Sequence, residues 1–274
     1  MLWPISHFVY SSFAYFGAVR GGELPGRWFV LAFAEAGFGE PAVRQTLYRM
    51  ERSGELTSRR EGREKLYTPS AYARAEIVAG SEKIFRAPEP WDGRWTIVHA
   101  RFERDERIHR DRLQELLRVE GFASVAPGLH VHPRPLGDRV LAAVDPAVRT
   151  RVLATRGIRL GDEPDERFIA RHWDIPALAG RYRKTLRALA RLAAAPGRDD
   201  SDAFRRRFDV VMRFLTVAWD DPGLPPALLP DPWPGTEARE TAARLYRRFL
   251  PGALRFGDGV LERVGHPEMA EARS

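Results

Sequence analysis

The sequence contains no cysteine among its 274 residues. Disulfide bonds, thiolate nucleophiles and zinc sites with sulfur ligands are therefore excluded, and a metal site would have to use histidine and carboxylate side chains. The sequence also lacks any run close to the roughly 18 apolar residues that span a bilayer, and its N-terminal stretch lacks the basic segment of a secretory signal. We therefore expect a cytoplasmic protein with no membrane partner.

Lysine is scarce, because only 3 of the 44 basic residues are lysine and the other 41 are arginine. The planar guanidinium group suits phosphate better than an ammonium group does, but a GC-rich genome would produce the same excess of arginine. The net charge of +7 favours polyanionic partners, although it is spread over a long chain. A hydrophobic content of 44% is that of an ordinary globular protein, and the length predicts two or three domains.

Two helices joined by a short turn are expected near the N-terminus. Residues 29–37 carry apolar side chains at helical spacing and end on a glycine. The next helix begins near Glu40, because Pro41 fits the first turn of a helix without losing a hydrogen bond. The predicted buried stripe of this second helix consists of Val43, Leu47 and Met50.

An arginine-rich hairpin is expected directly after the second helix, with strands over residues 55–60 and 63–68 and a tight turn between them. Helix, turn, helix and hairpin together predict a winged helix-turn-helix, in which one helix enters the major groove and the hairpin reaches phosphates. The predicted DNA-binding residues are Arg44, Gln45, Tyr48, Arg49, Arg59, Arg60, Arg63 and Lys65. The alternative is a solvated helix with a charged hairpin, since four glutamates dilute the positive charge.

The middle of the chain predicts a small ferredoxin-like sheet. A connecting helix over residues 71–85 and a proline-rich linker precede a strand over 95–102 and a helix over about 106–120. An extended stretch ending at residue 132, a strand over 138–144, a helix from Asp145 to about residue 156 and a short strand follow. This βαββαβ order is typical of the ferredoxin-like fold.

Three histidines in this region raise a metal-site hypothesis. His130 and His132 share one face of an expected strand, and His99 is on another strand that could be its neighbour. The alternative is a pair of half-exposed histidines without a ligand, because no nearby spacing of acidic residues completes a site. We predict no metal.

A basic helix opens the C-terminal part, over residues 174–195, with Asp174 as its N-cap. No acidic residue occurs from residue 181 to 198. We predict that this face binds phosphates of DNA or of an anionic ligand, although packing against an acidic neighbour would produce the same pattern. The predicted ligand-binding residues are Arg183, Lys184, Arg187 and Arg191. Further helices are expected over residues 204–221 and 236–256, on either side of a proline-rich loop.

Five segments carry a resemblance to a known family: RGGELPGRW (20–28), VRQTLYRMERSGELTSRREGREKLY (43–67), WDGRW (91–95), HWDIPALAGRY (172–182) and DPGLPPALLPDPWPG (221–235). In their order and spacing the chain resembles the PaaX family, bacterial repressors of phenylacetic acid catabolism. The resemblance implies a dimer with an N-terminal winged helix, a central ferredoxin-like domain similar to Cas2, and a C-terminal helical domain. It also implies that an aryl-CoA or other acyl-CoA thioester, such as phenylacetyl-CoA, releases the protein from double-stranded operator DNA.

We therefore expect an α+β protein with domains at residues 1–75, 76–172 and 173–274, acting as a repressor and not as an enzyme, without a cofactor. One alternative is a Cas2-like metal-dependent nuclease. That reading would require an aspartate on the strand over 95–102, where the sequence WTIVHARF has none. The other alternative is a regulator of the same fold that senses a different small molecule.

Overall fold

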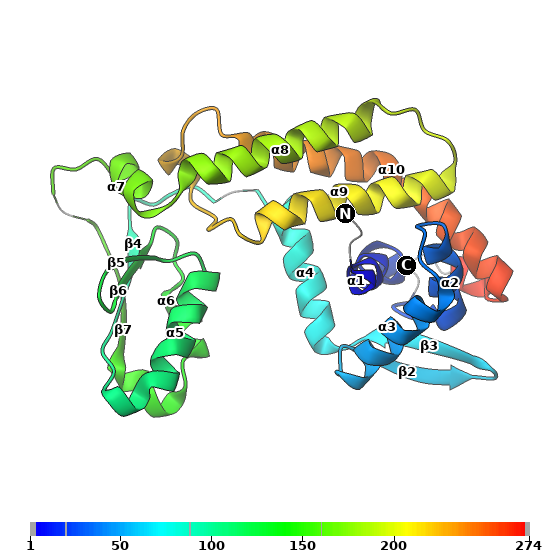
Figure 1. Ribbon diagram of the computed structural model, residues 1–274, viewed down its shortest axis with the longest axis horizontal. Helices are drawn as coiled ribbons and strands as arrows, with labels where there is room; N and C mark the ends of the chain where they lie inside the picture. The colour runs from blue at the N-terminus through cyan, green and yellow to red at the C-terminus, as the bar shows by residue number, and fades with distance from the viewer. Residues whose placement is uncertain (1–3, 20, 88, 160, 272–274) are drawn as a thin grey trace. The chain divides into compact units, whose positions relative to one another are not determined.

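The computed structural model describes residues 4–19, 21–87, 89–159 and 161–271 (Figure 1). The chain divides into two compact units, and each combines segments that are far apart in sequence. The first unit contains Met1–Arg86, Thr185–Thr216 and Glu237–Ser274, and the second contains Ala87–Lys184 and Val217–Thr236. The division into three domains at residues 75 and 172 stays a prediction.

The N-terminal elements follow the predicted order of helix, helix and hairpin. They are α1 (Ile5–Tyr15), β1 (Leu24–Pro25), α2 (Gly26–Ala34), α3 (Glu40–Arg52), β2 (Leu56–Glu61) and β3 (Glu64–Pro69). The three strands form an antiparallel sheet in the order β1-β3-β2. Gly62 opens the two-residue loop between β2 and β3 with a φ of 59°, the positive value that a type II′ turn requires at its first central position. The helix expected over residues 29–37 lies three residues earlier, and α1 was not predicted.

The connecting helix α4 (Ala71–Phe85) was predicted correctly, and the backbone N–H of Ala73 donates to Ser70 Oγ at its N-terminus. The first unit is completed by parts of three long helices: α8 (Ile175–Ala194), α9 (Asp200–Ala218) and α10 (Pro234–Val264). A short helix α11 (Pro267–Glu271) follows. Helix α10 extends beyond the expected residue 256 and contains Pro251 in its interior.

The N-terminal helices share one core with the C-terminal helices in the first unit. The Phe8 ring of α1 stacks on Phe208 of α9, with centroids 3.2 Å apart. Trp28 Nε1 of α2 donates to the carbonyl oxygen of Gly257 in α10 at 3.0 Å. Because Trp28 is fully buried, this bond satisfies a donor that would otherwise be buried without an acceptor.

The second unit contains the predicted βαββαβ order. Its strands and helices are β4 (Trp95–Ala100), α5 (Arg107–Val119), β5 (Ala123–Ala126), β6 (Leu129–His132), α6 (Gly137–Ala143) and β7 (Val152–Gly157). The sheet is antiparallel in the order β5-β6-β4-β7, so the first strand lies between the third and the fourth, as in a ferredoxin-like sheet.

Two segments of this unit were assigned wrongly from the sequence. Residues 138–144, expected as a strand, belong largely to helix α6, and the helix expected from Asp145 is only the 3₁₀ helix Pro146–Arg151 before β7. Val140 and Val144 are both buried at i, i+4 spacing. A short apolar run fits a helix and a strand equally well, which explains the error.

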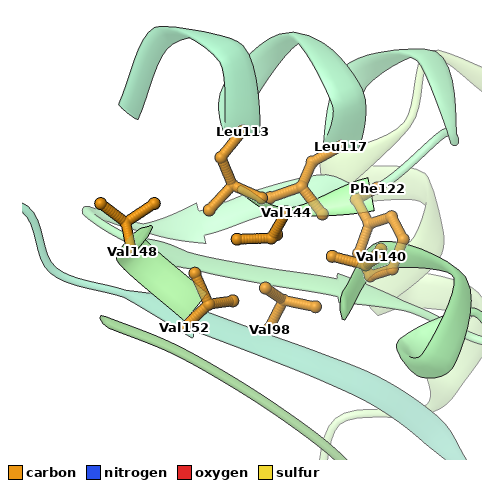
Figure 2. Close-up of a cluster of buried hydrophobic side chains, with 8 residues drawn as sticks. All are labelled: Val98, Leu113, Leu117, Phe122, Val140, Val144, Val148 and Val152. Carbon is orange, nitrogen blue, oxygen red and sulfur yellow. The ribbon is translucent and has the colours of Figure 1, made fainter. Parts of the chain in front are cut away.

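The sheet of the second unit is covered on both faces. On one face the α5 side chains Leu113 and Leu117 point toward Val98 and Val152 of the strands (Figure 2). On the other face, Trp95 and Val131 pack with residues of the short helix α7 (Asp165–His172), the start of α8 and the proline-rich loop. Helix α7 was not predicted.

Candidate nucleic-acid interface

Helix α3 separates a buried stripe from an exposed polar face. Val43, Leu47 and Met50 are at most 2% exposed, as predicted from their spacing. Pro41 lies in the first turn, where its missing N–H costs no hydrogen bond. The exposed side chains of α3 include the four that were predicted to read bases, Arg44, Gln45, Tyr48 and Arg49. The α3 side chains therefore project as the sequence indicated.

One face of the β2–β3 hairpin is joined to α3 through Glu51. Glu51 Oε1 accepts from Ser58 Oγ, and Glu51 Oε2 lies against Lys65 Nζ, each at 2.6 Å. Both bonds lower the pKa of the Glu51 carboxyl, and the bond from Lys65 has the larger effect. The same bond to Glu51 raises the pKa of Lys65. Ser58 and Lys65 come from β2 and β3, so both strands are tied to the helix at one carboxylate.

The other face of the hairpin is tied to the segment before α2. Arg59 Nε and Nη2 contact Glu23 Oε2 at 3.0 and 2.7 Å, and Arg59 Nη1 contacts Glu61 at 2.5 Å. The guanidinium of Arg59 holds the pKa of the Glu23 carboxyl below its usual range. Arg59 is therefore already paired with two carboxylates of its own chain.

The eight predicted DNA-binding residues thus fall into two groups. Arg44, Arg59 and Lys65 have carboxylate partners, Arg44 through Glu40 at 2.6 Å. The others are exposed, and Tyr48 lies under Arg52 with its ring 5.9 Å from the guanidinium carbon. Within the described residues, no hydrogen-bond or ion-pair partner occupies the side chains of Gln45, Arg49, Arg60 and Arg63.

The carboxylates Glu23 and Glu51 were missed in the sequence because no local spacing marks them. Glu51 is 14 residues from Lys65, and Glu23 is 36 residues from Arg59. The tight turn at Gly62 fixes the hairpin register, and this register places Ser58 and Lys65 on one face. That shared face could have been predicted from the sequence. Which face meets α3 depends on tertiary packing.

Three family models match consecutive parts of the chain. They are described as PaaX-like protein at residues 6–73, PaaX protein central Cas2-like domain at 88–167, and PaaX-like protein C-terminal domain at 173–259. The chain belongs to the PaaX family. The central model agrees with the ferredoxin-like sheet of the second unit.

Two individual proteins are similar to this PaaX-family chain over most of its length. The transcriptional repressor PaaX of Escherichia coli (strain K12) is 27% identical over 253 residues, which are 86% of this chain and 78% of that protein. The uncharacterized protein Rv0674 from Mycobacterium tuberculosis has a similar structure, with a TM-score of 0.61 and 22% identity, covering 93% of this chain and 99% of that chain. The latter likeness concerns the fold alone.

The basic face of α8 lies on one long helix of this PaaX-family chain. Arg183, Arg187 and Arg191 follow one another at i, i+4 spacing, and all three are exposed together with Lys184. In the described parts of the chain no carboxylate lies within 4.0 Å of these four side chains. Arg181 does have an acidic neighbour, since its Nη1 lies 2.7 Å from Asp220 Oδ2. The alternative of an acidic packing partner therefore applies to Arg181 and not to the predicted ligand-binding residues.

The histidines do not converge. His99 pairs with Leu129 in the sheet, whereas His130 pairs with Val98, so His99 projects from the opposite face to His130 and His132. His132 is fully buried, accepts the Arg134 N–H at Nδ1 and donates from Nε2 to the carbonyl oxygen of Pro222, both at 3.0 Å. Burial lowers its pKa to about 4, so the ring is neutral at pH 7. These positions contradict the metal-site hypothesis, and no cluster of three potential metal ligands occurs among the described residues.

No helix in the described residues is both long and apolar enough to cross a bilayer. The longest, α10, carries charged side chains along its whole length.

Proposed function

We propose that this chain is a dimeric transcriptional repressor that binds double-stranded operator DNA through a winged helix-turn-helix. In this proposal α2 and α3 are the helix-turn-helix and the β2–β3 hairpin is the wing. The observation that carries the proposal is the face formed by α3 and the hairpin, on which Gln45, Arg49, Arg60 and Arg63 have no partner within the described chain. The name of the E. coli relative, transcriptional repressor PaaX, supports the same function.

Each part of this face has a role that follows from its chemistry. Helix α3 is narrow enough for the major groove, where amide and guanidinium groups donate to base edges. Gln45, Tyr48 and Arg49 contact bases, together with Arg44 once it leaves Glu40. The hairpin arginines Arg60 and Arg63 contact phosphates, which add affinity without reading the sequence.

The paired residues Arg59 and Lys65 contribute in a different way. Each must exchange a carboxylate for a phosphate before it adds to DNA affinity. Both ion pairs are at least partly open to solvent, which screens them and keeps them weak enough for that exchange. Until then, Arg59 holds the hairpin to Glu23 and Lys65 holds it to Glu51. The wing is thereby positioned before DNA arrives.

The regulated genes and the effector are those that the family resemblance implies. The protein represses an aromatic acid operon of the phenylacetate type, and an acyl-CoA such as phenylacetyl-CoA releases it. The basic residues Arg183, Lys184, Arg187 and Arg191 of α8 bind the phosphates of the effector, since a polyphosphate ligand needs such a row of cations. By linkage, the effector weakens DNA binding only as far as it favours the weakly binding conformation, typically by about 1 to 3 kcal/mol.

The proposal is tested by enriching genomic fragments on the purified full-length protein, followed by gel-shift titration of the enriched site with phenylacetyl-CoA and a panel of other thioesters. A two-fold symmetric site with half-sites about 10 bp apart, or a multiple of that, is expected for a dimer. Release by one thioester names the effector, and release only by another small molecule favours a regulator of the same fold with a different ligand. No enriched fragment at moderate salt contradicts the DNA-binding function.

A further inference from the structure

Arg207 of α9 is a buried cation held between two aromatic rings of the first unit. The residue is 1% exposed. Its guanidinium carbon lies 3.4 Å from the centre of the Tyr15 ring and 3.8 Å from the centre of the Tyr246 ring. The rings belong to α1 and α10, so side chains from three helices meet here. Cation–π attraction stabilises the charge, and the Tyr246 side chain also hydrogen-bonds the guanidinium, but the ring faces provide no acceptor for Nε or Nη2.

Three buried polar atoms of this cluster have no hydrogen-bond partner among the described residues: Nε and Nη2 of Arg207 and the hydroxyl of Tyr15. Burial lowers the pKa of Arg207, because desolvation penalises the charged form. A guanidinium nevertheless remains protonated in proteins, so the site carries a positive charge. A buried charge whose Nε and Nη2 groups lack acceptors is costly, and native proteins rarely keep such groups without a reason.

Neighbouring arginines of the same helix do have partners. Arg206 Nε lies 2.7 Å from Asp202 Oδ2, and its Nη1 donates to the carbonyl oxygen of Ala195 at 2.7 Å. Arg213 pairs with Asp209 at 3.2 Å. Each of these two arginines therefore has a carboxylate partner, although Nε of Arg213 is also buried without an acceptor, whereas within the described chain Arg207 has no carboxylate in ion-pair range.

We infer that the Nε/Nη2 edge of Arg207 binds the carboxylate of a small organic anion, with the Tyr15 hydroxyl as an additional donor. Nε–H and one N–H of Nη2 are parallel, and this edge binds both oxygens of a carboxylate at once. A carboxylate supplies the missing negative charge and the missing acceptors together. An apolar ligand or a neutral amide would leave the charge uncompensated.

The site is closed in this structure, because solvent reaches none of the three atoms. One of the flanking rings must therefore move before an anion enters. Tyr15 is 7% exposed, whereas Tyr246 is only half-buried and so has room to turn toward solvent. Tyr246 is accordingly the gate, and Tyr15 is the fixed wall of the site.

An anion held by both Arg207 and Tyr15 links α9 to α1. Helix α1 packs against α3 and α4 in the same unit, so the site is mechanically connected to the proposed DNA-reading helix. This consequence for DNA binding rests on the proposed function. Binding of the anion itself does not, and it is measured without DNA.

The test is the thermal unfolding midpoint of the full chain in increasing sodium acetate and sodium benzoate, compared with sodium chloride at equal ionic strength. We expect a saturable rise with at least one carboxylate beyond that in chloride, because a ligand that binds the folded state stabilises it. Arg207→Met keeps the apolar stem but removes the fork, and should abolish the additional rise. Arg207→Lys keeps the charge but removes the bidentate donor, so it should reduce the additional rise in the unfolding midpoint. Tyr15→Phe should reduce the additional rise as well. Arg74→Met, at an exposed arginine of α4 in the same unit, is the matched control.

A second measurement uses the unmodified protein, in case Arg207→Met fails to fold. In ¹⁵N-arginine-labelled protein, the buried Nε–H of Arg207 exchanges slowly and should shift downfield in a saturable manner when the carboxylate binds. Equal midpoints in carboxylate and chloride, or no saturable change of that Nε–H signal, overturn the inference. Anion binding without any enriched operator fragment would support this site and contradict the proposed function. An enriched operator without anion binding would support the proposed function and contradict this site.

Discussion

Lys65 Nζ lies 2.6 Å from Glu51 Oε2, so a single ion pair joins strand β3 of the hairpin to helix α3. The same carboxylate accepts from Ser58 of β2. If α3 and the hairpin bind DNA as proposed, a negative charge at this place has two opposite effects. It fixes the hairpin against the helix, but it also occupies a lysine and repels phosphate.

Glu51→Gln separates these two effects. The substitution releases Lys65 for a phosphate contact, so we expect tighter binding to random DNA and a salt dependence steeper by about one unit of log–log slope. The wing is then held less firmly, so the preference for operator over random DNA should fall. Fluorescence anisotropy titrations at several NaCl concentrations measure both quantities.

Glu262→Gln is the matched control, since Glu262 is an exposed carboxylate of α10 whose loss changes the net charge equally. An identical salt slope for Glu51→Gln and the parent protein would show that Lys65 does not gain a phosphate contact.

Arg60→Ala and Gln45→Ala should change DNA binding in different ways, the first in overall affinity and the second in sequence preference. Arg60 is an exposed hairpin side chain, and its loss should weaken binding to all sequences alike and flatten the salt slope by about 1. Gln45 lies on the exposed face of α3, and its loss should relax the preference at one base position by about 1 to 3 kcal/mol. Binding to a library of operator variants measures both. If Gln45→Ala keeps the sequence profile of the parent, α3 does not read bases through this residue.

His132 should make the stability of the second unit depend on pH. Its folded-state pKa, about 4, is below the usual value of 6.5, so the unfolded chain binds the proton more readily. Its stabilising contribution is complete above pH 6.5 and is lost as the pH falls toward 4, a change of roughly 3 kcal/mol in the free energy of unfolding. Urea unfolding at pH 7, 6, 5 and 4.5 measures the loss.

His132→Gln should be less stable than the parent at pH 7 and should lose less stability on acidification. His99→Gln, at an exposed position of β4, serves as the control and should follow the parent. Some pH dependence should remain in both variants, because burial also lowers the pKa of His130. Parallel curves for His132→Gln and the parent would contradict this assignment.

The sequence predicted those features that depend on local spacing. The i, i+4, i+7 stripe of α3 and the hairpin turn at Gly62 follow from periodicity and turn chemistry, and both are present. The βαββαβ order was predicted as well, although helix α6 was taken for a strand. Short amphipathic segments such as α1 and α7 gave too little periodic signal.

The contacts that depend on distant segments could not be predicted. Nothing in the local sequence links Trp28 to Gly257, or Arg207 to Tyr15 and Tyr246, because these pairs meet only when the N-terminal helices pack on α9 and α10. The same limit applies to Glu51 and Lys65. For the predicted DNA-binding set, the sequence identified the basic residues but not which of them are already paired.

The four basic residues of α8 should matter for the effector more than for the operator. Replacing Arg183, Lys184, Arg187 and Arg191 together with glutamine removes an exposed cationic row without removing any ion pair of the described chain. If this row binds the phosphates of an acyl-CoA, the concentration needed for half-release from DNA should rise at least tenfold, about 1.4 kcal/mol. DNA affinity without effector should change little.

The matched control replaces four exposed arginines of the second unit, Arg94, Arg101, Arg104 and Arg112, and so lowers the net charge by the same amount. Equal losses of DNA affinity in both variants, with an unchanged effector response, would mean that the α8 row acts only through its net charge.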